Sequence, residues 1–403
     1  MKRKNEALAH LAAYGPRRRR VWPWVTAAVV VLALAAGGTW YASSRTGSPS
    51  SGAGTTTTAA ASGGGSATPA FAVAAVSPAS GASGVASDTT IAIRFTAPLP
   101  GATPTGAALP TLEPAVAGSW HRSARSTLEF VPSAPFVPGS TETVSIPGGP
   151  GGVQDAGGQS LASTDAVTFT IAHGSEERLQ QLLALTGYIP LTFTPSGPTP
   201  PPAQAAMPQA GGFTWRWAGL PASLTSLWTE GSSSAITKGA VMALEDQNKL
   251  SVDAVAGPEV WSVLLDDVAK GTTDPAPYTY VDVSKSLPQS MTVWVNGAPQ
   301  FANIPVNTGA PGADTTDGVY EVFEHVTSSE MKGTNTDGST YDDPNVPWAS
   351  YFNGGDALHG FVRATYGSPQ SNGCVEMSIS DAAATWPYTP IGTLVNVEGP
   401  PVT

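Results

Sequence analysis

Cysteine and charged residues are both scarce in this chain. Among 403 residues there is one cysteine, Cys374, and Asp, Glu, Lys and Arg together make up 12%. A single thiol excludes an internal disulfide, and with five scattered histidines it forms no metal-ligand cluster, so we expect no metal. Glycine (44 residues) and proline (37) are abundant, and 41% of residues are hydrophobic. This composition predicts a folded protein of turns and short strands with few long surface helices.

Basic residues are concentrated at the N-terminus. Residues 1–20 hold seven Lys and Arg against one acidic residue, which leaves 12 basic and 29 acidic residues in the remainder of the chain. Non-specific binding to nucleic acid needs a cationic surface. The acidic body therefore argues against that class of partner, and we expect no nucleic-acid binding.

An uncharged segment, VWPWVTAAVVVLALAAGGTWYA (21–42), follows the basic tail. As a helix, its 22 residues would span roughly 33 Å, which is enough to cross a bilayer. Aromatic residues at both ends suit the membrane interfaces, and the preceding charges place residues 1–20 in the cytoplasm. We predict a single-pass anchor in the cell membrane with the rest of the chain exported to the cell-wall space. A cleaved signal peptide is the alternative.

The next two segments differ sharply in complexity. Residues 43–70 are almost entirely Ser, Thr, Gly and Ala, which predicts a flexible linker. Residues 71–173 alternate short β-type runs with Gly and Pro turns and predict a β-sandwich. The runs are TIAIRF (90–95), TLEFVP (127–132), TETVSIP (141–147) and AVTFTIA (166–172). In this order, the segment resembles bacterial immunoglobulin-like domains.

Residues 175–270 change to a helical pattern. It begins with SEERLQQLLALTGY and continues, after a proline-rich insertion at 195–209, with ITKGAVMALEDQNKLSVDAVAGPEVWSVLL. Apolar residues three and four positions apart predict amphipathic helices. The segment resembles three-helix peptidoglycan-binding modules, which implies binding to the cell wall; a helical spacer is the alternative.

Residues 275–400 return to strand patterns and contain the thiol. Only SDAAATW (380–386) has a helical pattern among runs such as YTYVDVS, MTVWVNG, GVYEVFEHV and TLVNVEG. We therefore expect a mainly β, multidomain protein. Its parts are a membrane anchor, an immunoglobulin-like β-sandwich, a small helical module and a β-rich C-terminal domain.

Cys374 lies in a polar turn, GSPQSNGCVEM, rather than in an apolar strand. An ordinary thiol is only a few per cent ionised at neutral pH, so a nucleophilic cysteine needs a nearby base. His359 precedes Cys374 by 15 residues, a distance that two strands and a loop can close. Gly373 lets backbone amides turn toward a developing oxyanion. From the residues alone, an inert buried thiol and a different base, His325, remain alternatives.

The order of residues around this thiol resembles the catalytic domain of L,D-transpeptidases of the YkuD type. The set comprises His359-Gly360, Gly367, Ser371-Asn372-Gly373-Cys374 and a glycine before TLVNV. Upstream, DTTDGVYEVFEH (314–325) resembles the family's Thr-Pro-x-Gly-x-Tyr/Phe strand. VPWASYFNGGDALHG (346–360) resembles the segment that leads from the family's lid into its histidine.

This resemblance implies a cysteine acyltransferase that uses no cofactor and forms 3→3 cross-links between peptidoglycan stem peptides. Cys374 is then the nucleophile and His359 the base, oriented by the carbonyl of Gly360, while the amides of Gly373 and Cys374 bind the oxyanion. Water as acceptor would make the same site an L,D-carboxypeptidase. We expect four further residues to line the substrate site, namely Ser371, Asn372, Tyr320 and Trp348, with residues 326–350 lining or covering it.

Two positions depart from the family pattern. Asn372 stands where the family has a second histidine, and Glu376 where it has Arg or Asn. The first change removes a proton carrier. The second removes a cation that would lower the thiol pKa, and an inward-facing carboxylate would raise that pKa. A non-catalytic wall-binding or spacer protein is therefore the second hypothesis.

Overall fold

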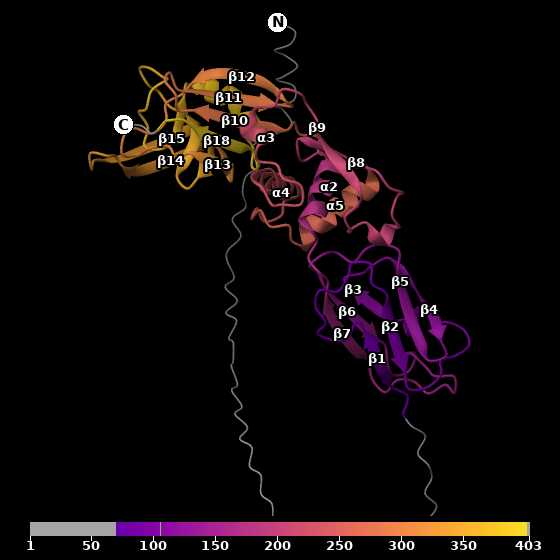
Figure 1. Cartoon of the computed structure of the whole chain (residues 1–403). Coiled ribbons are helices and arrows are strands. Elements are labelled where there is room, and N and C mark those ends of the chain that lie inside the picture. The colour runs from indigo at the N-terminus through magenta and orange to yellow at the C-terminus, as the bar shows by residue number, and fades with distance from the viewer. Residues whose placement is uncertain (1–69, 105, 401–403) are drawn as a thin grey trace, which may run out of the picture. The chain divides into compact units, whose positions relative to one another are not determined.

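The computed structural model describes residues 70–104 and 106–400 (Figure 1). The predicted cytoplasmic tail (1–20), the anchor (21–42) and the linker up to residue 69 lie outside the described residues. Within the described ranges, no helix has the length and apolar character needed to span a membrane.

The first part is a sandwich of two antiparallel sheets, as the strand patterns predicted (Figure 1). One sheet has the order β1-β2-β5-β4, with bounds Val73–Ser77, Ile91–Phe95, Thr127–Pro132 and Gly118–Ala124. The other has the order β3-β6-β7, with bounds Thr111–Glu113, Thr141–Ile146 and Asp165–Thr170. Alternate residues of both sheets face inward and form one core, with Ile93, Leu128, Val144 and Phe169 almost fully buried.

The helical part contains α2 (Glu176–Leu185), the short α3 (Ala222–Thr225), α4 (Ala235–Asn248) and α5 (Pro258–Lys270). The Ser175 hydroxyl caps α2 by accepting a hydrogen bond from the Arg178 N–H at 3.2 Å. A proline at its first position starts α5, and Gly271 in the left-handed conformation ends it. The proline-rich insertion lies in the connection of a hairpin, β8 (Leu191–Pro195) and β9 (Gly211–Trp215).

The helices and the β8–β9 hairpin of residues 175–270 supply most of one buried cluster, and this cluster continues into the C-terminal domain. Leu182, Leu244 and Trp261 share one buried cluster with Tyr280 and Leu394 of the C-terminal domain. The backbones also meet directly, because a Cβ built on Gly239 of α4 would lie 2.4 Å from the carbonyl oxygen of Gly392. The helices are therefore a packed support of the C-terminal domain.

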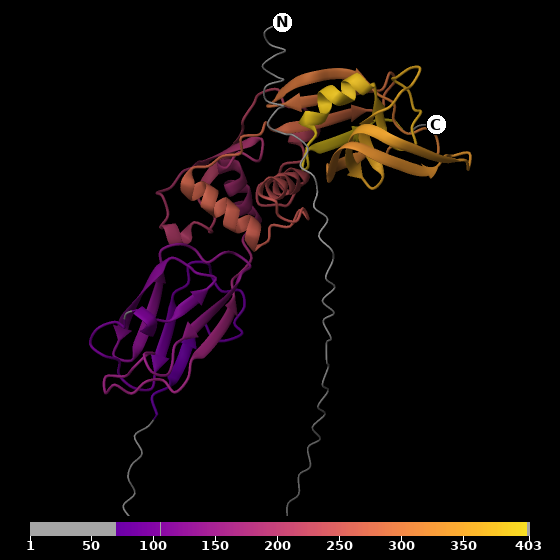
Figure 2. The ribbon, with the colours of Figure 1, turned by 180° about the vertical axis from the view of Figure 1, so that it is seen from behind.

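Two sheets make up the C-terminal domain. The first has the order β12-β11-β10-β18-β13, with bounds Ala298–Pro305, Ser290–Val295, Thr279–Ser284, Leu394–Glu398 and Gly318–Glu321. The second has the order β14-β15-β16-β17, with bounds Glu324–Thr334, Thr340–Asn353, Asp356–Gly360 and Val375–Met377. The predicted helix is present as α6 (Ile379–Thr385), the yellow helix seen from behind in Figure 2. It contributes Ala382 to the core that both sheets share.

The stretch that was expected to line or cover the site is a long hairpin, β14–β15. Its register pairs Glu324 with Tyr351 near the base and Thr334 with Thr340 at the tip. The register shifts between Ser329 and Met331, opposite Pro344 and the left-handed Asn345. This bulge accommodates a proline that cannot donate to the ladder.

Candidate active site

His359 and Cys374 meet through the pairing of β16 with β17. The two strands are parallel, and His359 lies opposite Glu376 while Leu358 lies opposite Val375. Cys374 directly precedes β17, two residues before Glu376, so both side chains project on the face that carries His359. His359 is 3% exposed and Cys374 is half-buried. The structure therefore brings the two predicted residues to adjacent strands.

The imidazole of His359 is held by the next residue of its own strand. Nδ1 lies 3.1 Å from the Gly360 carbonyl oxygen, which can only accept, so Nδ1 carries the hydrogen. In the neutral ring, Nε2 is then the acceptor. Burial lowers the pKa of His359, although the bond to Gly360 opposes this effect. A neutral imidazole with a basic Nε2 is therefore the resting form at neutral pH.

The thiol of Cys374 is also held in its neutral form. Burial is the largest cause that raises its pKa, to about 12, and the carboxylates of Asp356 and Glu376 add to it. The Sγ atom contacts the carbonyl oxygen of Gly355 at 3.7 Å. The site thus pairs a thiol with an imidazole rather than a thiolate with an imidazolium.

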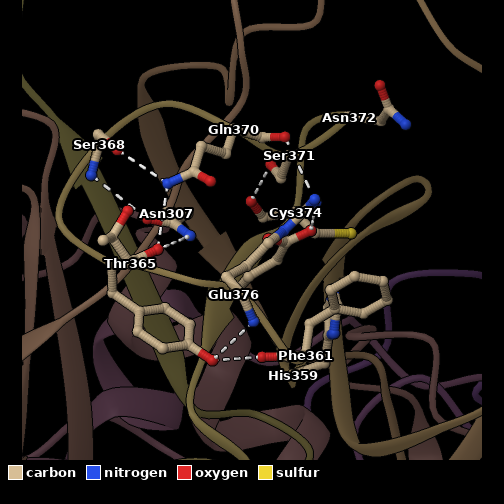
Figure 3. Close-up of polar contacts among 12 residues, drawn as sticks. Asn307, His359, Phe361, Thr365, Ser368, Gln370, Ser371, Asn372, Cys374 and Glu376 are labelled. Carbon is tan, nitrogen blue, oxygen red and sulfur yellow. Dashed lines mark hydrogen bonds and ion pairs between the residues drawn. The ribbon is translucent and has the colours of Figure 1, made fainter.

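Within the turn before Cys374, the Ser371 hydroxyl and the Gly373 N–H bond to the turn itself. The sequence had predicted that the first would contact the substrate and the second the oxyanion. The Ser371 hydroxyl donates to the Cys374 carbonyl and accepts from the Gly373 N–H at 3.2 Å (Figure 3). Ser371 is 1% exposed, so it stabilises the turn and does not face a substrate. The Gly373 amide is likewise occupied, which corrects the expected pair of oxyanion donors. Within the described part of the chain, the Cys374 N–H donates no hydrogen bond.

Although Glu376 stands where the family has Arg or Asn, a cation is still present, because Arg363 pairs with Glu376. The guanidinium of Arg363 donates from Nε to Oε2 and from Nη2 to Oε1, both at 2.7 Å. Arg363 follows β16 in the chain, and its Cζ also lies over the ring of Phe361, 4.7 Å from the ring centroid. Arg363 therefore neutralises the carboxylate that replaces the family's Arg or Asn.

Asn372 points to the β14–β15 hairpin and not to the thiol. Its amide Nδ2 donates to Oδ1 of Asn335, at the hairpin tip, at 2.7 Å. In Figure 3, its side chain lies apart from the yellow sulfur of Cys374. The residue in the place of the family's second histidine thus links the cysteine turn to the hairpin.

The remaining predicted residues lie around the domain core. The Tyr320 hydroxyl donates to the carbonyls of Thr316 and Asp317, and its ring packs on Phe352. Trp348 packs against Trp386, with ring centroids 5.5 Å apart. Both side chains are partly exposed, and the carboxylate of Asp356 is near enough to Tyr320 to help raise its pKa.

The rival base, His325, is engaged elsewhere. Its ring stacks on Trp386 with centroids 3.9 Å apart, and its Nε2 lies 2.9 Å from the Trp386 carbonyl oxygen. Burial lowers its pKa to about 4. His325 is therefore a structural residue of the hairpin base.

Sequence reasoning missed Asp356, which lies beside the cysteine turn. A Cβ built on Gly373 would lie 2.3 Å from Oδ1 of Asp356. Burial raises the pKa of this carboxyl to about 6, and the amide of Asn353 opposes the shift. The pairing of β16 with β17 brings it there, and no local sequence signal marks it.

Comparisons with known families agree with this architecture. Residues 278–397 match the model of the L,D-transpeptidase catalytic domain (YkuD), and residues 67–171 match the bacterial Ig-like domain (Big_5). The chain therefore contains an L,D-transpeptidase catalytic domain and a bacterial Ig-like domain. L,D-transpeptidases act on the stem peptides of peptidoglycan. No curated protein matches the chain.

Solved L,D-transpeptidases are among the similar structures. L,D-transpeptidase 3 from Mycobacterium tuberculosis, in complex with a faropenem-derived adduct, is 16% identical with a TM-score of 0.28, covering 81% of this chain and 98% of that one. An L,D-transpeptidase from Mycobacterium smegmatis is 14% identical with a TM-score of 0.27, covering 82% and 100%. The catalytic domain from E. faecium L,D-transpeptidase acylated by ertapenem is 24% identical with a TM-score of 0.27, covering 31% and 100%.

Proposed function

We propose that this chain is a cell-wall L,D-transpeptidase that forms 3→3 peptidoglycan cross-links through an acyl-enzyme on Cys374. The observation that carries the proposal is the orientation of His359. Because its Nδ1 is committed to the Gly360 carbonyl, its Nε2 is left as an acceptor on the face of β16–β17 that also carries Cys374. A half-buried thiol on the same face as a buried neutral imidazole suits general-base catalysis.

In the acylation step, Sγ attacks the carbonyl carbon of the third residue of a tetrapeptide stem. The S–C bond forms as the thiol proton moves to Nε2 of His359, and the carbonyl electron pair moves onto oxygen. The tetrahedral intermediate collapses, the C–N bond to D-Ala breaks, and the imidazolium returns its proton to the leaving amine. Because the resting pair is neutral, proton transfer accompanies the attack and no thiolate is required.

In the second step, an amine from a neighbouring stem attacks the thioester. His359 takes the amine proton as the new C–N bond forms. It passes this proton to Sγ as the S–C bond breaks, which restores the neutral thiol and imidazole. Water in place of the amine would give an L,D-carboxypeptidase with the same residues. The acceptor amine is cationic before it loses its proton, and the carboxyl of Asp356 near the thiol favours a cation there.

The other parts of the chain fit this role. Residues 21–42 would anchor the protein in the cell membrane, with residues 1–20 in the cytoplasm and the body in the cell-wall space. The linker at 43–70 would let the body reach the wall. Peptidoglycan binding by residues 175–270 is part of the same proposal, and their packing on the C-terminal domain would hold a wall strand near the catalytic residues.

Muropeptides incubated with the protein and analysed by mass spectrometry test the function. We expect new 3→3 dimers with the wild type, none with Cys374→Ala or His359→Gln, and wild-type yield with His121→Gln, an exposed histidine of β4. Shortened stems without dimers would indicate a carboxypeptidase.

Ertapenem, which acylates the E. faecium catalytic domain, gives a second readout. We expect intact mass to rise by one adduct on Cys374. If neither adduct nor changed stems are found with the wild type, the protein is a non-catalytic wall-binding or spacer protein.

A further inference from the structure

A hydrogen bond to the Gly373 carbonyl oxygen fixes the orientation of the peptide group between Gly373 and Cys374. The hydroxyl of Thr315 donates to the Gly373 carbonyl oxygen at 2.6 Å and accepts from the Gly309 N–H at 2.9 Å. Thr315 is 0% exposed, so no water competes for this bond. In a planar trans peptide, the N–H points opposite to the carbonyl. The bond to Thr315 therefore also fixes the direction of the Cys374 N–H.

Thr315 is itself held by a buried cation. The side chain of Lys285 is 1% exposed, and its Nζ donates to the Thr315 carbonyl at 3.0 Å. The same ammonium pairs with Asp314 at 3.1 Å and Asp317 at 2.8 Å. A buried ammonium is retained only where it is paired and hydrogen-bonded. Lys285 thus fixes the 314–317 turn from which the Thr315 hydroxyl reaches the cysteine turn.

The neighbouring backbone donors are already used. The Gly373 N–H donates to Ser371 Oγ, and the Glu376 N–H donates to the Asn307 carbonyl at 2.9 Å. The Cys374 N–H, in contrast, has no acceptor among residues 70–104 and 106–400. Unpaired N–H groups are rare in protein interiors, and this one is free to donate to an acceptor that enters the site.

We propose that Thr315 is a positioning residue that aims the Cys374 N–H at the oxyanion, and that Lys285 holds Thr315 in place. This inference rests on the acyl transfer proposed above. When Sγ bonds to the carbonyl carbon, the electron pair displaced onto oxygen accepts a hydrogen bond from the Cys374 N–H. The hydroxyl on the opposite side of the same peptide polarises it and strengthens that donor.

Comparing two reactions of Cys374 tests the role of Thr315. Ertapenem acylation passes through an oxyanion, whereas alkylation by iodoacetamide displaces iodide and forms none. We expect Thr315→Val to lower the acylation rate constant roughly 10- to 100-fold. This is no more than the decrease caused by removing an oxyanion donor completely, because the Cys374 N–H is still present. Alkylation should stay within about 3-fold of wild type, and Thr315→Ser, which keeps the hydroxyl, should restore acylation.

Lys285→Met is a second test of the same inference. It replaces Thr315→Val if that variant is not properly folded, as judged by a lack of cooperative unfolding. It should show the same selective loss of acylation, because Thr315 loses its anchor. Equal losses in both reactions, or no loss in either, would overturn the inference. If the wild type is alkylated but not acylated, the proposed function fails instead, so the two failures are distinguishable.

Discussion

Arg363 and Glu376, which lies on β17 two residues after Cys374, form a bidentate ion pair, with both N···O distances 2.7 Å. Glu376 lies opposite His359 in the ladder and its side chain is 6% exposed, while that of Arg363 is 30% exposed. The pair lets a carboxylate occupy a buried position two residues from Cys374. Without the guanidinium, that charge would be unpaired and would raise the thiol pKa further.

Replacing Arg363 by Gln should therefore destabilise the fold and lower the reaction rate of the Cys374 thiol. We expect a loss of about 2–4 kcal/mol in the free energy of unfolding, because a buried carboxylate loses its partner. The alkylation rate of Cys374 at pH 7.5 should also fall. Urea unfolding and iodoacetamide kinetics measure the two effects.

A double variant and a surface pair control this experiment. Arg363→Gln with Glu376→Gln should recover most of the stability, because no unpaired charge remains. Lys270→Gln removes the partner of Asp266, where both side chains are more than half exposed (64% and 57%), and should cost less than about 1 kcal/mol. Similar losses from Arg363→Gln and Lys270→Gln would contradict this account of Glu376.

Asn372 should contribute little to the chemistry of the thiol. Its amide is bonded to Asn335 of the hairpin tip and not to Sγ. We expect Asn372→Ala to change the ertapenem acylation and iodoacetamide alkylation rates less than about 5-fold, because an exposed hydrogen bond contributes roughly 1 kcal/mol. A loss of 100-fold in acylation would show that Asn372 acts on the substrate after all.

The sequence predicted the sandwich strands β2, β5, β6 and β7 and most strands of the C-terminal domain because their alternation is local, but it did not mark β1, β3 and β4. TETVSIP, for example, corresponds to β6 (Thr141–Ile146), and YTYVDVS contains β10 (Thr279–Ser284). It missed β15, because Pro344 and Pro347 argue against a strand. Pro344 lies in the bulge of β15, outside the register, whereas Pro347 is paired with Ser328.

The candidate site was predictable only in part, for a similar reason. Cys374 and His359 stand in an ordered motif that can be read along the chain. Thr315, Asp356 and Arg363 reach the cysteine turn from other segments, and the pairing of strands sets those approaches. The roles of Ser371 and Gly373 were misread because a hydroxyl and an amide in a turn bond to each other before they bond to a ligand.

Asp356 makes the stability of the fold depend on pH. Its pKa is raised to about 6 by burial, against roughly 3.9 in the unfolded chain, so the folded protein binds the proton more tightly. Its contribution to stability is therefore full below pH 4 and is lost as the pH rises to about 6. Asp356→Asn should remove this dependence and be more stable than wild type at pH 7.5 by about 1–3 kcal/mol.

Urea unfolding at pH 4 and pH 7.5 measures this effect as a difference between variant and wild type. Glu230→Gln, at an exposed position, should give no difference at either pH. Asp356→Asn should also speed alkylation of Cys374 at pH 7.5, because the carboxylate that raises the thiol pKa is gone. Equal stability differences at both pH values would show that Asp356 titrates normally.

Gly373 is required both by its backbone conformation and by the carboxyl beside it. Its φ of 117° is one that residues with a side chain rarely adopt, and a Cβ there would lie 2.3 Å from Oδ1 of Asp356. We expect Gly373→Ala to cost more than about 3 kcal/mol and to reduce ertapenem acylation at least 10-fold, because the turn must move. Gly338, at the hairpin tip, also has a positive φ, of 86°, but no atom lies within 4 Å of its Cβ position. Gly338→Ala should therefore lower the free energy of unfolding by only about 1–2 kcal/mol. Equal losses of stability at the two glycines would show that the contact with Asp356 does not contribute.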